Sequence, residues 1–149
     1  MRKIAAHYIL NPGEEPIKNG IIEIDDNGKI LKLRASSELK EESHLEFYNG
    51  VLVPGFINVH THLELSHFKG KIERGTGITG FITQINSSRN TYVAEDGLFK
   101  KELRKMHQSG TQAIGDIANT KDTLKAKMDS PIFSHTFIEL FGLNPDMAS

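Results

Sequence analysis

The chain has 149 residues, 38% of them hydrophobic and 25% charged, values typical of a globular protein with its own core. Lys and Arg number 18 against 19 Asp and Glu, and cysteine is absent. No broad basic field is therefore present to attract nucleic acid or an anionic membrane, and disulfides, thiolate catalysis and cysteine-ligated zinc are excluded. The first residues lack the cleavage site of a signal peptide, and no apolar stretch approaches membrane-spanning length. We therefore expect a cytoplasmic protein that binds neither nucleic acid nor membrane.

Short β-strands dominate the amino-terminal third of the chain. They are expected over residues 3–10, 21–24, 29–34 and 44–53. The second and third strands flank Asp-Asp-Asn-Gly, whose Asn27-Gly28 pair is typical of a hairpin turn. Residues 35–43 indicate a short polar helix, and Asn49-Gly50 indicates a tight turn. The sequence thus predicts a separate small all-β unit.

After Pro54 the pattern changes to strands that alternate with helices. Strands are expected over residues 55–62, 111–118 and 132–142, helices over residues 78–89, 94–109 and 120–130, and a polar loop over residues 64–77. Gly110 follows the second helix, where a glycine commonly ends a helix. Such alternation predicts βα units and a parallel sheet.

A His-Thr-His triplet ends the first of these strands, in the run "VLVPGFINVHTHLELSH". Side chains alternate along a strand, so Asn58, His60 and His62 are expected on one face, with the two imidazoles side by side. Neutral imidazole is a common ligand of zinc and iron. A bare His-x-His pattern by itself favours a hydrogen-bonded pair of histidines, and only its surroundings favour a metal site.

Those surroundings closely resemble the first barrel strand of the amidohydrolase superfamily of metal-dependent hydrolases. The superfamily pattern Pro-Gly-Phe-(Ile/Val)-(Asn/Asp)-x-His-x-His is matched by Pro54, Gly55, Phe56, Ile57, Asn58, His60 and His62. The preceding "IKNGIIEIDDNGKILKL" resembles the amino-terminal hairpin of that superfamily. The segment "HTHLELSHFKGKIERGTGITGFI" resembles the branch that holds cytosine, guanine, adenosine-type and aminodeoxyfutalosine deaminases and triazine hydrolases.

The resemblance implies an α/β fold with two parts. Residues 1–53 would form the amino-terminal portion of a small β-sandwich. Residues 54–149 would form the first three strands of an incomplete (β/α)8 barrel of the TIM type.

The resemblance also implies the chemistry of the site. His60 and His62 would ligate one divalent metal, zinc or iron(II), which activates a water molecule. That water would attack a ring carbon of a small amino-substituted nitrogen heterocycle, and ammonia would leave. Triazine dechlorination and imidazolone ring opening share this metal–water chemistry and stay open as alternatives, as does a site with one or two metal ions.

The other metal ligands of the superfamily lie on its fifth, sixth and eighth barrel strands, whereas this chain reaches only the third. A complete barrel needs about 250 residues. We therefore expect the chain to be the amino-terminal portion of a longer hydrolase. It has no catalytic residue beyond the two metal ligands, and we expect it to be inactive alone. The alternative is a non-catalytic, truncated paralogue that serves as a binding or interaction module.

Four further residues have expected roles in or near the site. Glu64 follows the histidine pair, where the superfamily contacts substrate, and is either a substrate ligand or a solvated loop residue. Glu139 ends the third strand and is expected to point into the mouth of the site. Asp116 faces either that mouth or a helix start, and we favour a structural cap. His135 is expected to be a packed core histidine.

The run "IFSHTFIELF" over residues 132–141 would leave an open, apolar parallel edge. Such edges recruit other chains. We therefore expect self-association, or pairing with the carboxyl-terminal part of the longer enzyme.

Overall fold

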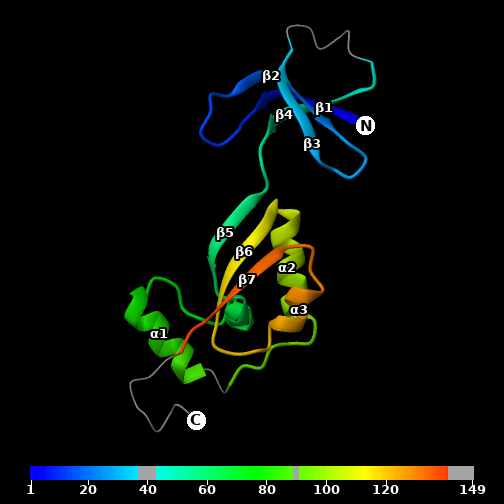
Figure 1. Ribbon diagram of the computed structural model, residues 1–149. Helices are drawn as coiled ribbons and strands as arrows, with labels where there is room; N and C mark the ends of the chain where they lie inside the picture. The colour runs from blue at the N-terminus through cyan, green and yellow to red at the C-terminus, as the bar shows by residue number, and fades with distance from the viewer. Residues whose placement is uncertain (37–42, 89–90, 141–149) are drawn as a thin grey trace. The chain divides into compact units, whose positions relative to one another are not determined.

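The computed structural model describes residues 1–36, 43–88 and 91–140. The chain divides into two compact units, Met1–Pro54 and Gly55–Ser149 (Figure 1). The assignment of the first unit to a sandwich and of the second to a barrel stays a prediction. No helix among the described residues is both long and apolar enough to cross a membrane.

The first unit is a four-stranded sheet in the order β3-β2-β1-β4. Its strands are β1 (Arg2–Ile9), β2 (Ile17–Ile24), β3 (Ile30–Ala35) and β4 (Leu45–Leu52). β2 runs antiparallel to β1 and β3, and β4 runs parallel to β1. The expected hairpin is confirmed between β2 and β3. Gly28 has a φ of 83° there, and its amide donates to Asp25 O. β2 begins earlier than expected because Ile17 already pairs with Ile9.

The tight turn expected at Asn49-Gly50 is wrong, because β4 continues through both residues. Ala6 pairs with Tyr48 and Tyr8 with Val51, so β4 has one residue more than β1 over this interval. The extra residue makes a β-bulge, which the φ of 145° at Gly50 accommodates. Most of the helix expected over residues 35–43 lies outside the described residues.

The second unit is built on a parallel sheet in the order β5-β6-β7. Its elements are β5 (Phe56–Thr61), the 3-10 helix η2 (Leu63–Phe68), α1 (Gly77–Ser88), α2 (Leu98–Gln108), β6 (Thr111–Ala118), α3 (Leu124–Met128) and β7 (Phe133–Ile138). Figure 1 shows α2 and α3 together beside the sheet and α1 apart from them. The expected mixed α/β fold with a parallel sheet is confirmed, whereas closure into a barrel stays a prediction.

Two local differences from expectation concern the segments that follow β5 and precede β6. The loop expected over residues 64–77 begins instead with η2, so the chain turns into a helix directly after the His-Thr-His triplet. α2 begins at Leu98 because Gly97, with a φ of 76°, interrupts the helical backbone before it.

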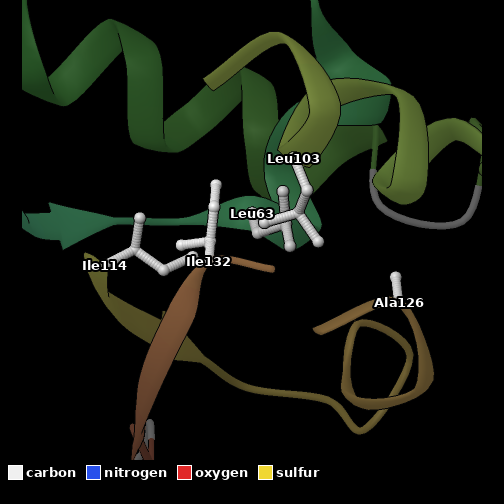
Figure 2. Packing of buried hydrophobic residues seen from close by; sticks show 5 residues of the cluster. All are labelled: Leu63, Leu103, Ile114, Ala126 and Ile132. Atoms are coloured by element: carbon white, nitrogen blue, oxygen red, sulfur yellow. The ribbon is translucent and has the colours of Figure 1, made fainter. Parts of the chain in front are cut away.

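The helices α2 and α3 cover one face of the sheet, and a small hydrophobic core lies between them and the sheet. Its members come from η2, α2, β6, α3 and the residue that precedes β7: Leu63, Leu103, Ile114, Ala126 and Ile132 (Figure 2). Phe99 and Met106 of α2 pack against them. Leu63 is fully buried although it stands directly after His62, so this core holds the segment that follows the histidine pair.

Large apolar residues elsewhere on the sheet strands are exposed. Ile57, Val59, Phe133 and Phe137 keep 69%, 75%, 70% and 51% of their surface exposed. His135, expected in the core, is exposed as well, so that prediction is wrong. It pairs with Gly115 of β6, and its ring lies against Phe137 at a centroid distance of 4.6 Å. Its neighbours thus leave one side of it open to solvent.

Candidate metal site

The two histidines of the triplet converge at the carboxyl-terminal end of β5. His60 is the penultimate residue of the strand, and His62 is the residue that precedes η2. Their Nε2 atoms are 3.3 Å apart, and their ring centroids are 5.2 Å apart. His60 is exposed and His62 is half-buried. Both side chains are therefore available to a ligand that approaches this end of the sheet.

The distance between the two Nε2 atoms fits a shared metal ion. In a tetrahedral zinc site with Zn–N bonds of about 2.0–2.1 Å, two ligand nitrogens lie about 3.3–3.4 Å apart. The observed separation is 3.3 Å. The same separation allows one ring to donate a hydrogen bond to the other when no metal is bound.

A β-bulge in β5 sets the direction of these side chains. Asn58 pairs with Ile114 and Thr61 with Asp116, so three steps on β5 match two steps on β6. The simple alternation that placed Asn58 on the face of both histidines is therefore wrong for this strand. The Asn58 side chain instead accepts a hydrogen bond from the His60 amide, at 3.1 Å. Bulges of this kind re-aim side chains at functional sites.

The histidine pair opens into a cavity of about 600 Å³. It is lined by two kinds of residues, the polar His60, His62, Asn86, Asn119 and Glu139 and the apolar Leu65, Ile78, Phe81, Ile82, Ile85 and Ile117. The polar groups come mainly from the ends of the three strands, and most of the apolar ones come from α1. A mostly apolar cavity with a few convergent polar groups is the usual form of a small-molecule site.

Glu139 reaches this cavity from the residue just after β7. Its amide donates to Ala118 O at 3.0 Å, and its carbonyl accepts a hydrogen bond of 2.7 Å from the Asn119 side chain. Its Oε2 is buried and has no hydrogen-bond partner within the described parts of the chain. A buried carboxylate oxygen without a partner is costly, so a donor supplied by a ligand would satisfy it.

Glu64 lies elsewhere, although it follows the histidines by only two residues. It is 6% exposed, and its Oε2 accepts hydrogen bonds of 3.0 Å from the amides of Asn119 and Thr120 and from the Thr120 hydroxyl. It lines a neighbouring cavity with His67 rather than the one with His60 and His62. The structure therefore shows a backbone anchor, and a substrate contact by Glu64 stays a prediction.

Asp116 acts as the structural cap that the sequence favoured, so this prediction is confirmed. It is fully buried, and its Oδ1 accepts the amide of Leu63, the first residue of η2, at 2.8 Å. Its partner Lys127, with Nζ 2.6 Å from Asp116 Oδ2, was missed by the sequence. α3 also carries Lys125, which is exposed, and no pattern in so short a helix distinguishes the buried lysine from the exposed one.

The donor set available to a metal is incomplete within the described residues. They contain no group of three or more His, Cys, Asp or Glu side chains placed to hold an ion. The two imidazoles fit part of a coordination sphere, because catalytic zinc sites use about three protein ligands. Two imidazoles converge at this end of the sheet, and a catalytic zinc site would need at least one further ligand.

Comparison with known proteins shows which proteins this chain resembles. No family model matches the chain. An aminodeoxyfutalosine deaminase of Nitratiruptor sp. is 34% identical over 97 residues, which are 64% of this chain and 24% of that protein. The crystal structure of Helicobacter pylori aminofutalosine deaminase with methylthio-coformycin superposes with a TM-score of 0.78 and 23% identity, over 99% of this chain and 37% of that one. Zinc-complexed atrazine chlorohydrolase from Arthrobacter aurescens gives a TM-score of 0.66 at 19% identity, over 91% and 35%.

These proteins are members of the amidohydrolase superfamily. The chain belongs to this superfamily and matches the amino-terminal portion of its members. The resemblance read from the segment around His60 and His62 is thereby confirmed. The chain spans about a quarter of the length of the curated relative from Nitratiruptor, 24%.

Proposed function

We propose that the chain supplies the first two metal ligands and part of the substrate cavity of a hydrolase that deaminates an amino-substituted nitrogen heterocycle. The observation that carries this proposal is the 3.3 Å separation of the His60 and His62 Nε2 atoms at the edge of a cavity of about 600 Å³. The names of the relatives, aminodeoxyfutalosine deaminase among them, support deamination over the other reactions of the superfamily.

A divalent metal, zinc or iron(II), would supply a water molecule with its pKa lowered toward about 7. His60 and His62 would hold that metal through Nε2. The apolar residues of the cavity, most of them on α1, contact the faces of a flat ring and exclude bulk water. Glu139 accepts a hydrogen bond from an N–H group of the heterocycle through its Oε2, which has no partner among the residues that the structure describes. These residues bind the ring and orient it within the cavity.

We further propose that β5, β6 and β7 are the first three strands of a (β/α)8 barrel. Barrel enzymes place their chemistry at the carboxyl-terminal ends of the strands. The histidines, Asn119 and Glu139 all stand at that end of this parallel sheet. We also propose that the first unit is part of a β-sandwich. We propose in addition that the protein is cytoplasmic.

The exposed apolar residues of the sheet support a partner for this unit. Ile57, Val59, Phe133 and Phe137 are each more than half exposed, and such clusters mark interaction surfaces. We propose that they are covered by the carboxyl-terminal part of the longer enzyme, or by self-association when the chain is alone.

The second candidate function concerns the chain in isolation. Only two metal-ligating side chains converge among the described residues, which favours a non-catalytic binding or interaction module for the 149-residue chain by itself. The two candidates differ in one property, turnover by the isolated chain.

An ammonia-release assay tests both. The zinc- or iron(II)-loaded longer protein that contains this chain, and the chain alone, are offered aminopurine nucleosides and aminopyrimidines. We expect turnover only by the longer protein, its loss in His60→Ala and His62→Ala, and its retention in His7→Ala, a histidine of the first unit. Full activity of either of the first two variants would contradict the proposed site. Turnover by the chain alone would contradict its proposed inactivity.

A further inference from the structure

We propose that the buried Asp116–Lys127 pair is a positioning device for the metal ligand His62, and that it acts through the amide of Leu63. This inference rests on the proposed function, because it assigns the pair a role in the proposed metal site.

The direction of the His62 side chain must be fixed through its backbone. Among the described residues, the only hydrogen-bond partner of its ring is His60, which is itself exposed. In this described part of the chain no carboxylate or carbonyl orients the imidazole, as one commonly does for metal-ligating histidines. The φ and ψ of His62, −119° and 78°, therefore set the direction of its Cα–Cβ bond and limit the positions that its Nε2 can reach.

Those angles are held by Leu63, the next residue, which is anchored twice. Its side chain is fully buried in the core under α2 and α3. Its amide is the first N–H of η2, which has no acceptor within the helix, and it donates to Asp116 Oδ1 at 2.8 Å. The bond to Asp116 of β6 thus holds the N–H side of the peptide group that links His62 to Leu63, while the His62 carbonyl accepts from the Leu65 amide at 3.0 Å.

Lys127 keeps Asp116 available for this hydrogen bond. The Asp116 and Lys127 side chains are 0% and 4% exposed, and Lys127 Nζ lies 2.6 Å from Asp116 Oδ2. Lys127 Nζ also donates to Thr136 Oγ1 of β7 at 2.8 Å. A buried carboxylate without a counter-ion would be strongly destabilising. The lysine leaves Oδ1 free for Leu63 and ties α3, β6 and β7 to the end of β5.

Two matched double variants separate this positioning role from general stability. Both Asp116→Asn/Lys127→Met and Asp116→Leu/Lys127→Met remove the buried charges. Only the asparagine side chain retains an oxygen that accepts the Leu63 amide. Zinc dissociation constants of the 149-residue chain are measured from the histidine ring resonances, with circular dichroism to verify folding. Amide hydrogen exchange of Leu63 is measured without metal.

We expect the asparagine variant to bind zinc within about threefold of the unmodified chain. We expect the leucine variant to bind about 10- to 100-fold more weakly, the range found for residues that orient metal ligands, and its Leu63 amide to lose protection. A control, Ile132→Val, perturbs the same core without touching Asp116 and should leave zinc affinity unchanged.

Equal zinc affinities in the two double variants, whether both retained or both lost, would overturn the proposal. Failure of the unmodified chain to bind zinc would instead contradict the proposed metal site. In that case Leu63 exchange alone decides the anchor, and equal protection of this amide in both double variants would overturn it.

Discussion

Gly115→Ala is the substitution whose effect the structure determines most sharply. Gly115 lies in the middle of β6, beside the backbone of Val59, the residue before His60. A Cβ at this position would lie 2.7 Å from the Val59 carbonyl oxygen and 3.1 Å from its carbon, and 3.3 Å from Phe137 Cε2. Ordinary contact begins at 3.4 Å, so an alanine here cannot be accommodated without movement.

The group that must move is backbone, because the closest atoms belong to a peptide group of β5 and no rotamer change displaces them. We expect a loss of about 1–3 kcal/mol in the free energy of unfolding, the usual cost of overpacking. β5 would also shift next to His60, so that the two Nε2 atoms no longer keep the separation of 3.3 Å. Zinc affinity should therefore fall together with stability.

Urea denaturation followed by circular dichroism measures the first effect, and zinc titration measures the second. Gly55→Ala is the matched control, because its Cβ would meet the side chain of Gln112, which is exposed and free to change rotamer. An alanine at position 115 that leaves both stability and zinc affinity unchanged would refute the close approach of β6 to β5 at Val59.

Two further predictions concern the support of the same unit. Leu103→Ala should lower the free energy of unfolding by about 2–5 kcal/mol, because Leu103 is 1% exposed at the centre of the core; a loss below about 1 kcal/mol in urea denaturation would contradict this packing. Glu102 has its pKa lowered from the ordinary 4.5, chiefly by the hydrogen bond from Lys105, and Lys69 adds to the effect. A lowered folded-state pKa stabilises the fold above the unfolded-state pKa, so Glu102→Gln should cost about 0.2–1 kcal/mol at neutral pH. That difference should vanish as the pH falls below 4.5, and a pH-independent difference would contradict the sign.

The features that the sequence predicted correctly are those in which local chemistry and tertiary structure agree. Gly28 takes the positive φ that a hairpin turn needs, and strands alternate with helices after Pro54. The family pattern around His60 and His62 is long and specific, so it identified the superfamily without help from the fold. These signals are carried by residue types that have few alternative uses.

The incorrect predictions share a dependence on neighbouring strands. Asn49-Gly50 suits both a turn and a bulge, and only the register of β4 against β1 decides between them. Alternation from Asn58 to His62 is interrupted by a second bulge, opposite β6. His135 was expected in a core because it lies on an apolar strand, but the structure leaves it exposed. The burial of Lys127 depends on Asp116 of β6 and Thr136 of β7, which lie 11 and 9 residues away on neighbouring strands.

The most direct test of the proposed metal site is a zinc titration of the 149-residue chain, followed through the ring resonances of its seven histidines. We predict that the resonances of His60 and His62 shift together with one common zinc dependence, while those of the other histidines stay in place. His60→Ala should abolish the shift of His62, and His62→Ala that of His60. Independent shifts of the two rings, or a response centred on another histidine, would contradict a metal held between His60 and His62.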